Sequence, residues 1–263
     1  MHLRVFAFII LVSLATAYDS YAQQQRRGRP GGGMGGPPQP RFGGSMAKLF
    51  GENKAFLADA EMEVKMQDGA ISMPGKIAFL DGKTRFEMDA TKMKGGNVPP
   101  QAAEQMKQMG MAEMISISRP DKKESYIIYP GLKSYAAAPE SEGSGATKDS
   151  PEPDLKRTEL GKETVDGHPT TKYKVIIKDD EGKEHESTVW AATDMKDFPI
   201  KIESVNDGMP STVLFKNVRL EKPEASLFEP PTDFQRYTDV GTMVREQMMK
   251  RFAPPGGVPQ PKQ

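Results

Sequence analysis

Several residue types are missing or scarce in this chain of 263 residues, and each absence excludes a class of function. The chain has no cysteine, which excludes disulfides, thiol nucleophiles and thiolate metal sites. It has only three histidines, and its formal net charge is +0. Because a neutral chain has no bulk electrostatic attraction for an anionic polymer, we expect no nucleic-acid partner.

Long apolar runs are also missing, with one exception at the N-terminus. Residues 1–22 combine a basic residue, an apolar stretch over 5–17 and a small-x-small pattern at 20–22. This arrangement is typical of a cleaved signal peptide, because the apolar stretch is shorter than the roughly 20 residues that a membrane span needs. No cysteine follows that could carry a lipid anchor. We therefore expect a soluble protein that is periplasmic or secreted.

Composition divides the rest of the chain. Residues 23–47 are rich in Gly, Pro, Gln and Arg and have little to bury, which predicts a disordered linker. Its arginines allow an RNA-binding segment or a flexible tether, and the tether is the simpler interpretation for an exported chain. Residues 48–237 form the expected folded domain, interrupted by a polar loop at 139–153. Residues 238–263 are predicted to be an amphipathic helix followed by a disordered tail.

Apolar and polar residues alternate most regularly in the first strand of the folded domain. One side of it is apolar, and the residues between these are Asp, Glu and Lys. Such a strand belongs to an antiparallel sheet with one wet face. The apolar side consists of Phe56, Ala58, Ala60, Met62, Val64 and Met66.

Similar patterns follow along the chain. A second strand places Met73, Ile77 and Phe79 on one face, and Asp81-Gly82 then forms a hairpin turn into a third strand with Phe86 and Met88. No strand–helix–strand alternation occurs, which argues against a parallel sheet. Further strands are predicted over 115–118, 125–129, 134–138, 172–177, 187–191, 200–205 and 212–220, with helical segments at 48–54, 101–108, 224–228 and 240–252.

The order of these motifs resembles the LolA-like superfamily, the half-barrel lipoprotein carriers of the bacterial envelope. The resemblance covers residues 48–237, and the chain is most similar to an uncharacterised branch of that superfamily. The motifs that carry it are GKIAFLDGKTRFEM, YIIYPGLKSYAAAP, LGKETVDGHPTTKYKV, the Phe198-Pro199-Ile200-Lys201 step and LFEPPTDFQRY.

The resemblance implies a mainly β (α+β) fold. It consists of a strongly curved antiparallel half-barrel sheet of about ten or eleven strands, with short helices covering the concave face. Trp190 matches a large residue on a central strand of the superfamily. The lipoprotein chaperones have an inward-facing arginine near the cavity mouth. Alternation turns Arg85 outward together with Lys83 and Glu87, so that role does not transfer to this chain.

Catalytic and metal sites find little support in the sequence. His168, in Asp166-Gly167-His168-Pro169, has no nucleophile motif near it, and His185 has only scattered carboxylates. Gly143-Ser144-Gly145 lacks the strand and helix of a phosphate-binding loop. We expect no enzyme, no cofactor and no metal.

Two functions remain open. The first is an exported binding protein that holds a lipid, an acyl chain or a lipoprotein in an apolar groove, as a monomer. The second is an envelope structural or interaction module whose apolar face is filled by its own side chains. The many methionines are consistent with both functions, because methionine occurs in adaptable ligand-binding surfaces and also in ordinary hydrophobic cores. The groove candidates are Phe56, Met62, Val64, Met66, Ile77, Phe79, Phe86, Met88, Met106, Met109 and Trp190.

The helix at 240–252 also has two interpretations. It has an apolar side that includes Met243 and basic residues at Arg245, Lys250 and Arg251. If it packs on the sheet, it is a lid or part of the core. If it does not, it suits peripheral contact with an anionic membrane.

Overall fold

The computed structural model describes residues 48–66, 69–95, 100–139, 155–178, 184–206 and 208–252. These residues all belong to one compact unit, residues 41–263. The predicted signal peptide, the predicted linker, the polar loop and the C-terminal tail lie outside the described residues, apart from Pro139 at the start of that loop.

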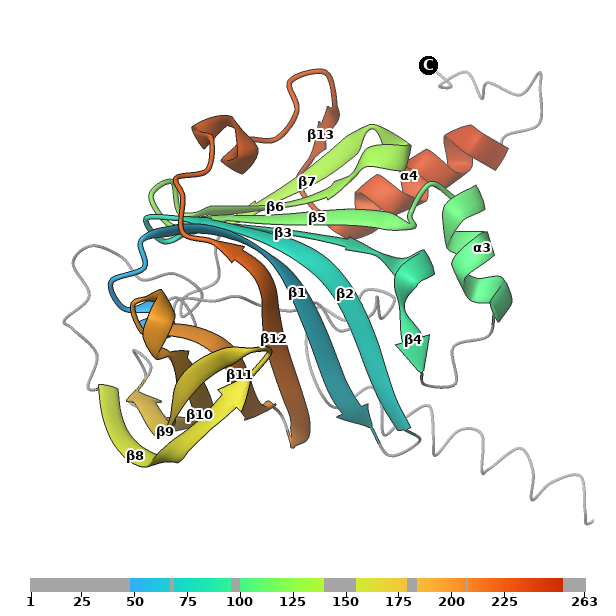
Figure 1. Ribbon diagram of the computed structural model, residues 1–263. Coiled ribbons are helices and arrows are strands. Elements are labelled where there is room, and N and C mark those ends of the chain that lie inside the picture. Colours follow the sequence, from blue (N-terminus) through green and yellow to red (C-terminus); the bar gives the residue numbers. More distant parts are fainter. Residues whose placement is uncertain are drawn as a thin grey trace, which may run out of the picture. The chain divides into compact units, whose positions relative to one another are not determined.

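One curved sheet of thirteen strands dominates the described chain (Figure 1). Its strand order is β13-β7-β6-β5-β3-β2-β1-β12-β11-β10-β9-β8, and β4 pairs with β2 off this path. Neighbouring strands are antiparallel, except that β13 pairs with β7 in parallel. The strands are β1 (Ala55–Met66), β2 (Gly69–Leu80), β3 (Lys83–Asp89), β4 (Lys94–Gly95), β5 (Glu113–Arg119), β6 (Glu124–Tyr129), β7 (Ser134–Pro139), β8 (Leu155–Val165), β9 (His168–Lys178), β10 (Glu184–Ala192), β11 (Phe198–Asn206), β12 (Met209–Arg219) and β13 (Gln235–Tyr237).

Helices are few and short. The α-helices of the described residues are α3 (Pro100–Gln108) and α4 (Val240–Phe252). Single turns of 3₁₀-helix are η2 (Lys48–Phe50), η3 (Ala90–Lys92), η4 (Pro130–Leu132), η5 (Thr193–Met195) and η6 (Ala225–Phe228). The predicted fold class, a curved antiparallel sheet with short helices, is confirmed. The strand count exceeds the expected ten or eleven. β4 and β13 are too short to leave an alternating pattern, and β8 has none because most of its residues are exposed.

Two tight two-residue turns connect consecutive antiparallel strands of the sheet. Asp81-Gly82 joins β2 to β3, and Asp166-Gly167 joins β8 to β9. In both turns the aspartate has φ of 49° and the glycine has φ of 84°. Positive φ at both central positions is the geometry that matches the twist of paired strands, and Asp-Gly adopts it with little strain.

The two faces of the sheet bury different side chains. We define the inner face as the one that carries alternate residues of β1 from Phe56 to Met66. The largest contact cluster extends along it from Tyr237 on β13 to Val175 on β9, as expected for the concave side of a curved sheet. The outer face has a smaller cluster around Ile117 and Ile128, which the fully buried Phe228 of η6 covers.

Helix α4 packs on the inner face, which is the packed arrangement of the two considered from the sequence. Met243 is 0% exposed, and Val240 and Met248 pack against the same cluster. The Nε2 atom of Gln247 lies within hydrogen-bond distance of Ser134 Oγ (2.9 Å) and Tyr237 Oη (3.1 Å). These contacts hold the helix over β7 and β13.

Two arginines fasten η6 to the outer face. Arg85 Nη1 donates to the carbonyl oxygen of Leu227 at 2.9 Å, and Arg119 Nη1 donates to that of Phe228 at 3.1 Å. The guanidinium of Arg119 also pairs with both carboxylate oxygens of Asp121 at 2.8 Å and with Glu229. The outward orientation that alternation predicts for Arg85 is therefore observed, and this side chain serves to anchor the η6 segment.

The Arg119 pairing predicts a loss of stability in acid. The hydrogen bond from Arg119 holds the pKa of Asp121 below its usual value of 3.8. A lowered folded pKa stabilises the protein above pH 3.8, and this contribution disappears as pH falls through the folded pKa. Urea unfolding should show that Asp121→Asn destabilises the protein at about pH 7 and that the difference shrinks below about pH 3. Asp233→Asn, which removes a carboxylate at an exposed site after η6, is the control and should leave the free energy of unfolding at about pH 7 nearly unchanged.

Candidate functional site

Six of the eleven predicted groove residues lie together in the buried part of the inner face. Their strands pair so that Phe56 lies opposite Phe79, Met62 opposite Met73, and Ile77 opposite Phe86. The ring of Phe86 lies directly over Gly75, where an added Cβ would come within 2.5 Å of it. The six are Phe56, Met62, Ile77, Phe79, Phe86 and Met88, and each is at most 6% exposed.

The chain fills the centre of this face with its own phenylalanines. Phe50, from the single turn η2, contacts Phe56, Phe79, Phe198 and Phe215 at ring-centroid distances of 4.6, 5.1, 5.8 and 5.8 Å. All five rings are at most 3% exposed. A ligand could reach this region only by displacing them, so the centre of the inner face is core rather than groove.

The inner face is more open toward the ends of β1 and β12. Val64 lies opposite Ile71 of β2, and both are only partly buried against the core. Met66 is 47% exposed and Met209, at the start of β12, is 37% exposed. Continuing the β1–β12 register beyond Val64 and Ser211 places these two methionines opposite each other. We call Val64, Met66, Ile71 and Met209 the open end.

Ile71 and Met209 are absent from the predicted set. The alternation of β2 could have indicated Ile71. Met209 depends on the pairing of β12 with β1, which no local pattern encodes.

The methionines of the α3 region are divided between core and surface. Met93 and Met111 pack partly against the inner-face cluster, whereas Met106 and Met109 lie outside it and are partly exposed. Helix α3 lies beside α4 at the same end of the sheet (Figure 1). Arg251 Nη1 of α4 donates to the carbonyl oxygen of Met109 at 3.1 Å. Met106 and Met109 are thus accessible at the surface of α3 and after its end, and their role as groove walls stays a prediction.

Trp190 is 3% exposed and belongs to the same core cluster as the other buried candidates, but charged side chains flank its ring. It follows Val189 on β10, and successive side chains of a strand point to opposite faces. Its ring lies between Lys172 Nζ at 4.6 Å and Lys201 Nζ at 4.2 Å from the centroid, and its indole N–H donates to Glu163. This hydrogen bond, with the two lysines nearby, lowers the pKa of Glu163. Trp190 is therefore a buried core residue with charged neighbours, rather than part of an open apolar groove.

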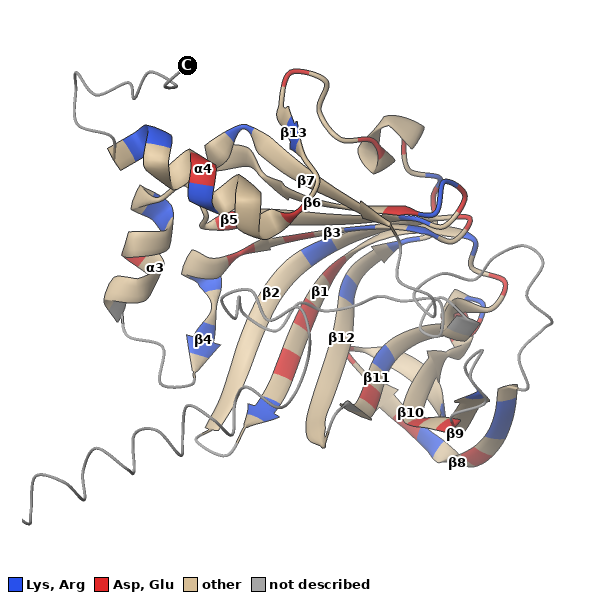
Figure 2. Ribbon diagram, turned by 180° about the vertical axis from the view of Figure 1, so that it is seen from behind, with Lys and Arg blue, Asp and Glu red and all other residues tan. Residues whose placement is uncertain are grey.

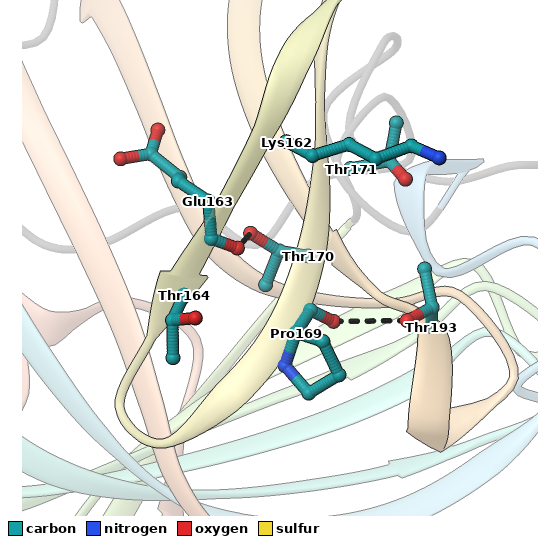
Figure 3. Close-up of a pocket in the computed structure, with 7 residues that line it drawn as sticks. All are labelled: Lys162, Glu163, Thr164, Pro169, Thr170, Thr171 and Thr193. Atoms are coloured by element: carbon teal, nitrogen blue, oxygen red, sulfur yellow. Dashed lines mark hydrogen bonds between the residues drawn. The ribbon is translucent and has the colours of Figure 1, made fainter.

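A cavity of about 350 Å³ adjoins the β8–β9 hairpin, and Figure 3 shows its polar lining. Thr170 Oγ1 donates to the carbonyl oxygen of Glu163 at 2.7 Å, and Thr193 Oγ1 donates to that of Pro169 at 3.1 Å. His168 Nδ1 lies 2.8 Å from Asp194 nearby. The protons of these two hydroxyls point to backbone carbonyls rather than to the imidazole, so this arrangement is not that of an activated nucleophile.

A second cavity, of about 440 Å³, is lined by residues of β1, β2, β3, β5 and β12, many of them charged. Both carboxylates and lysines line it, and Lys216 Nζ pairs with Glu61 at 2.7 Å. Within the described parts of the chain, no group of three or more potential metal-ligating side chains comes together. Among the same residues, no helix combines the length and apolarity needed to cross a bilayer.

Comparison with known proteins identifies a family and a set of similar folds. A family model described as "Domain of unknown function (DUF4412)" matches residues 58–200, which is more than half of the chain. Among curated proteins, none matches the sequence significantly.

Solved structures with similar folds include three from bacteria. A LolA superfamily protein from Nitrosomonas europaea is 7% identical, with a TM-score of 0.36, and the match covers 69% of this chain and 93% of that one. Lipoprotein LppX from Mycobacterium tuberculosis is 12% identical, with a TM-score of 0.37 and coverage of 66% and 90%. LprF from Mycobacterium bovis is 12% identical, with a TM-score of 0.35 and coverage of 72% and 93%. One of the three is described as a LolA superfamily protein.

Proposed function

The chain belongs to DUF4412, a family of domains of unknown function, and we propose that it is an exported protein that binds an apolar ligand at the open end of its inner face. The ligand class is a lipid or another molecule with an acyl chain. Export rests on the predicted signal peptide, which directs the chain to the periplasm or the exterior. We further propose that it binds without catalysing a reaction.

The observation that carries this proposal is the exposure of apolar side chains on a face that is otherwise buried. Met66 and Met209 are 47% and 37% exposed, and they continue the apolar surface of Val64 and Ile71. An acyl chain laid along these residues would remove them from water at about 25 cal/mol per Å² of apolar area. Methionine suits this task because its unbranched, polarisable side chain adapts to differently shaped ligands.

The same region offers a polar contact for the rest of the ligand. Ser204 and Ser211 lie on the inner face of β11 and β12, with their hydroxyl oxygens 3.0 Å apart. Ser211 lies opposite Val64 of the open end. Ser211 Oγ also lies 3.3 Å from the carbonyl oxygen of Ser204, to which it can donate. A hydroxyl group at one end of an apolar ligand could therefore donate to these hydroxyl oxygens next to the methionines.

Changing both exposed methionines to lysine should weaken ligand binding strongly. In Met66→Lys/Met209→Lys, two ammonium groups would have to lose water to contact an acyl chain, so affinity for a fluorescent fatty acid should fall at least about 10-fold. Native mass spectrometry of the protein purified from its own envelope should show an apolar adduct on the wild type and none on the double variant. Leu160→Lys, at a 54% exposed site on β8, is the matched control and should bind as the wild type does. Recovery of only ligand-free wild type, together with no affinity for the probe, would overturn the proposal.

One observation favours the second candidate function, an envelope structural or interaction module. Phe50 and its four neighbouring rings fill the centre of the inner face without any ligand. If the open end also stays empty in the purified protein, the inner face is a self-filled core. The predicted flexible arms at 23–45 and 254–263 would then be the segments that tether the protein or recruit partners.

A further inference from the structure

The two sides of α4 face different surroundings. Met243 is fully buried and Gln247 is hydrogen-bonded to β7, so this side is fixed to the sheet. On the opposite side, Met249 is 60% exposed, and Phe252, at 68%, is the most exposed large apolar residue of the described chain. With 3.6 residues per turn, positions 245, 249 and 252 align on one side of the helix. We call Arg245, Met249 and Phe252 the outward stripe.

The outward stripe lies in a basic environment. Helix α4 has three basic residues, Arg245, Lys250 and Arg251, against one carboxylate, Glu246. None of the three forms an ion pair with another described residue. Their hydrogen-bond partners are neutral: Thr242 Oγ1, Gln235 Oε1 and the carbonyl oxygen of Met109. Figure 2 shows basic residues on α4 and on the adjacent α3, and acidic residues on both helices as well.

We propose that the outward stripe of α4 docks on an anionic lipid surface. Exposed Phe and Met beside basic side chains that form no ion pair with a described residue combine apolar insertion with attraction to anionic headgroups. Each basic residue near such a surface adds roughly 1 kcal/mol, which is about five-fold in the partition coefficient. Two exposed apolar side chains offer much less area than the roughly 800 Å² per partner of a standard protein interface, which favours a lipid surface over a second copy of the chain.

Docking in this way would bring the β7 and β13 edge of the sheet to the membrane. Helix α4 needs no rearrangement for this contact, because its opposite side keeps its packing on the inner face. The contact is also separate from the open end, which lies at the ends of β1 and β12. Membrane docking and ligand binding can therefore fail independently, and each has its own test.

Co-sedimentation with vesicles tests the proposal on the full exported chain from residue 23 onward. The wild type should bind vesicles of phosphatidylglycerol and phosphatidylcholine more strongly than vesicles of phosphatidylcholine alone, and added salt should weaken this binding. Met249→Ser/Phe252→Ser should lower the partition coefficient about 10-fold or more. Arg245→Gln/Lys250→Gln should reduce binding to the anionic vesicles by a similar factor and remove much of the salt dependence.

Leu160→Ser, which also removes an exposed apolar side chain, is the matched control and should bind as the wild type does. Unchanged melting temperatures would show that the α4 variants are folded, since the changed residues are on the solvent side. Absence of wild-type binding to the anionic vesicles overturns the proposal, as does equal binding by the wild type and Met249→Ser/Phe252→Ser. A dimer that this double variant dissociates in gel filtration also overturns it, because the stripe is then an interface between copies.

Discussion

Replacing Phe56 with alanine is expected to lower the free energy of unfolding by about 3–5 kcal/mol. Phe56 is 0% exposed, and its ring centroid lies 4.6 Å from Phe50, 5.3 Å from Phe79 and 4.9 Å from Phe198. These rings come from η2, β2 and β11, so one truncation opens a cavity that the surrounding sheet cannot close. Urea unfolding followed by the fluorescence of Trp190 measures the change.

Phe252→Ala makes the same chemical change at a 68% exposed site. It should alter the free energy of unfolding by less than about 0.5 kcal/mol. If Phe56→Ala behaved like this control, the phenylalanine cluster would not be a rigid core, and the centre of the inner face would have to be reconsidered as a ligand site.

Removing all residues after Tyr237 should lower the melting temperature by about 6–12 °C. The deletion exposes the part of the inner face beneath Met243 and removes the hydrogen bonds that Gln247 makes to Ser134 and Tyr237. A loss of about 3 kcal/mol corresponds to this shift for a domain of 150–250 residues. Scanning calorimetry measures the shift, and greater binding of a hydrophobic dye would report the exposed surface.

A shorter deletion, of residues 253–263 only, is the matched control because it leaves α4 intact. Its melting temperature should equal that of the full chain. If the longer deletion also left the melting temperature unchanged, α4 would contribute nothing to the stability of the sheet.

Local patterns in the sequence predict most strands. The alternation from Phe56 to Met66 predicts β1 within one residue of its observed start, because a half-buried strand must place apolar side chains at every second position. Asp81-Gly82 marks a hairpin for an equally local reason, its tolerance of positive φ. The limits of α4 are those expected for 240–252, since its apolar positions follow the helical period.

The candidate site is formed by contacts between distant segments, which local sequence patterns do not predict. Phe50 enters the inner face from a single helical turn, and one turn has no periodicity to reveal which way a side chain points. Met209 joins the open end only because β12 pairs with β1. Trp190 is a buried core residue, and two lysines from neighbouring strands also flank its ring. In each case, pairing between distant segments determines the surroundings of the residue.

The pairing of β1 with β12 has a consequence for the order in which the chain can fold. Asn217 of β12 donates a hydrogen bond to Asp59 of β1 across 158 positions of sequence, whereas β1 and β2 form a local hairpin. At 5–20 residues per second, β12 leaves the ribosome roughly 8–30 s after β1. Throughout that interval one side of β1 presents unpaired backbone N–H and C=O groups and an apolar surface. An unpaired, apolar strand edge can pair with other chains and cause aggregation. We therefore expect the nascent chain to need chaperone binding until β12 has been synthesised.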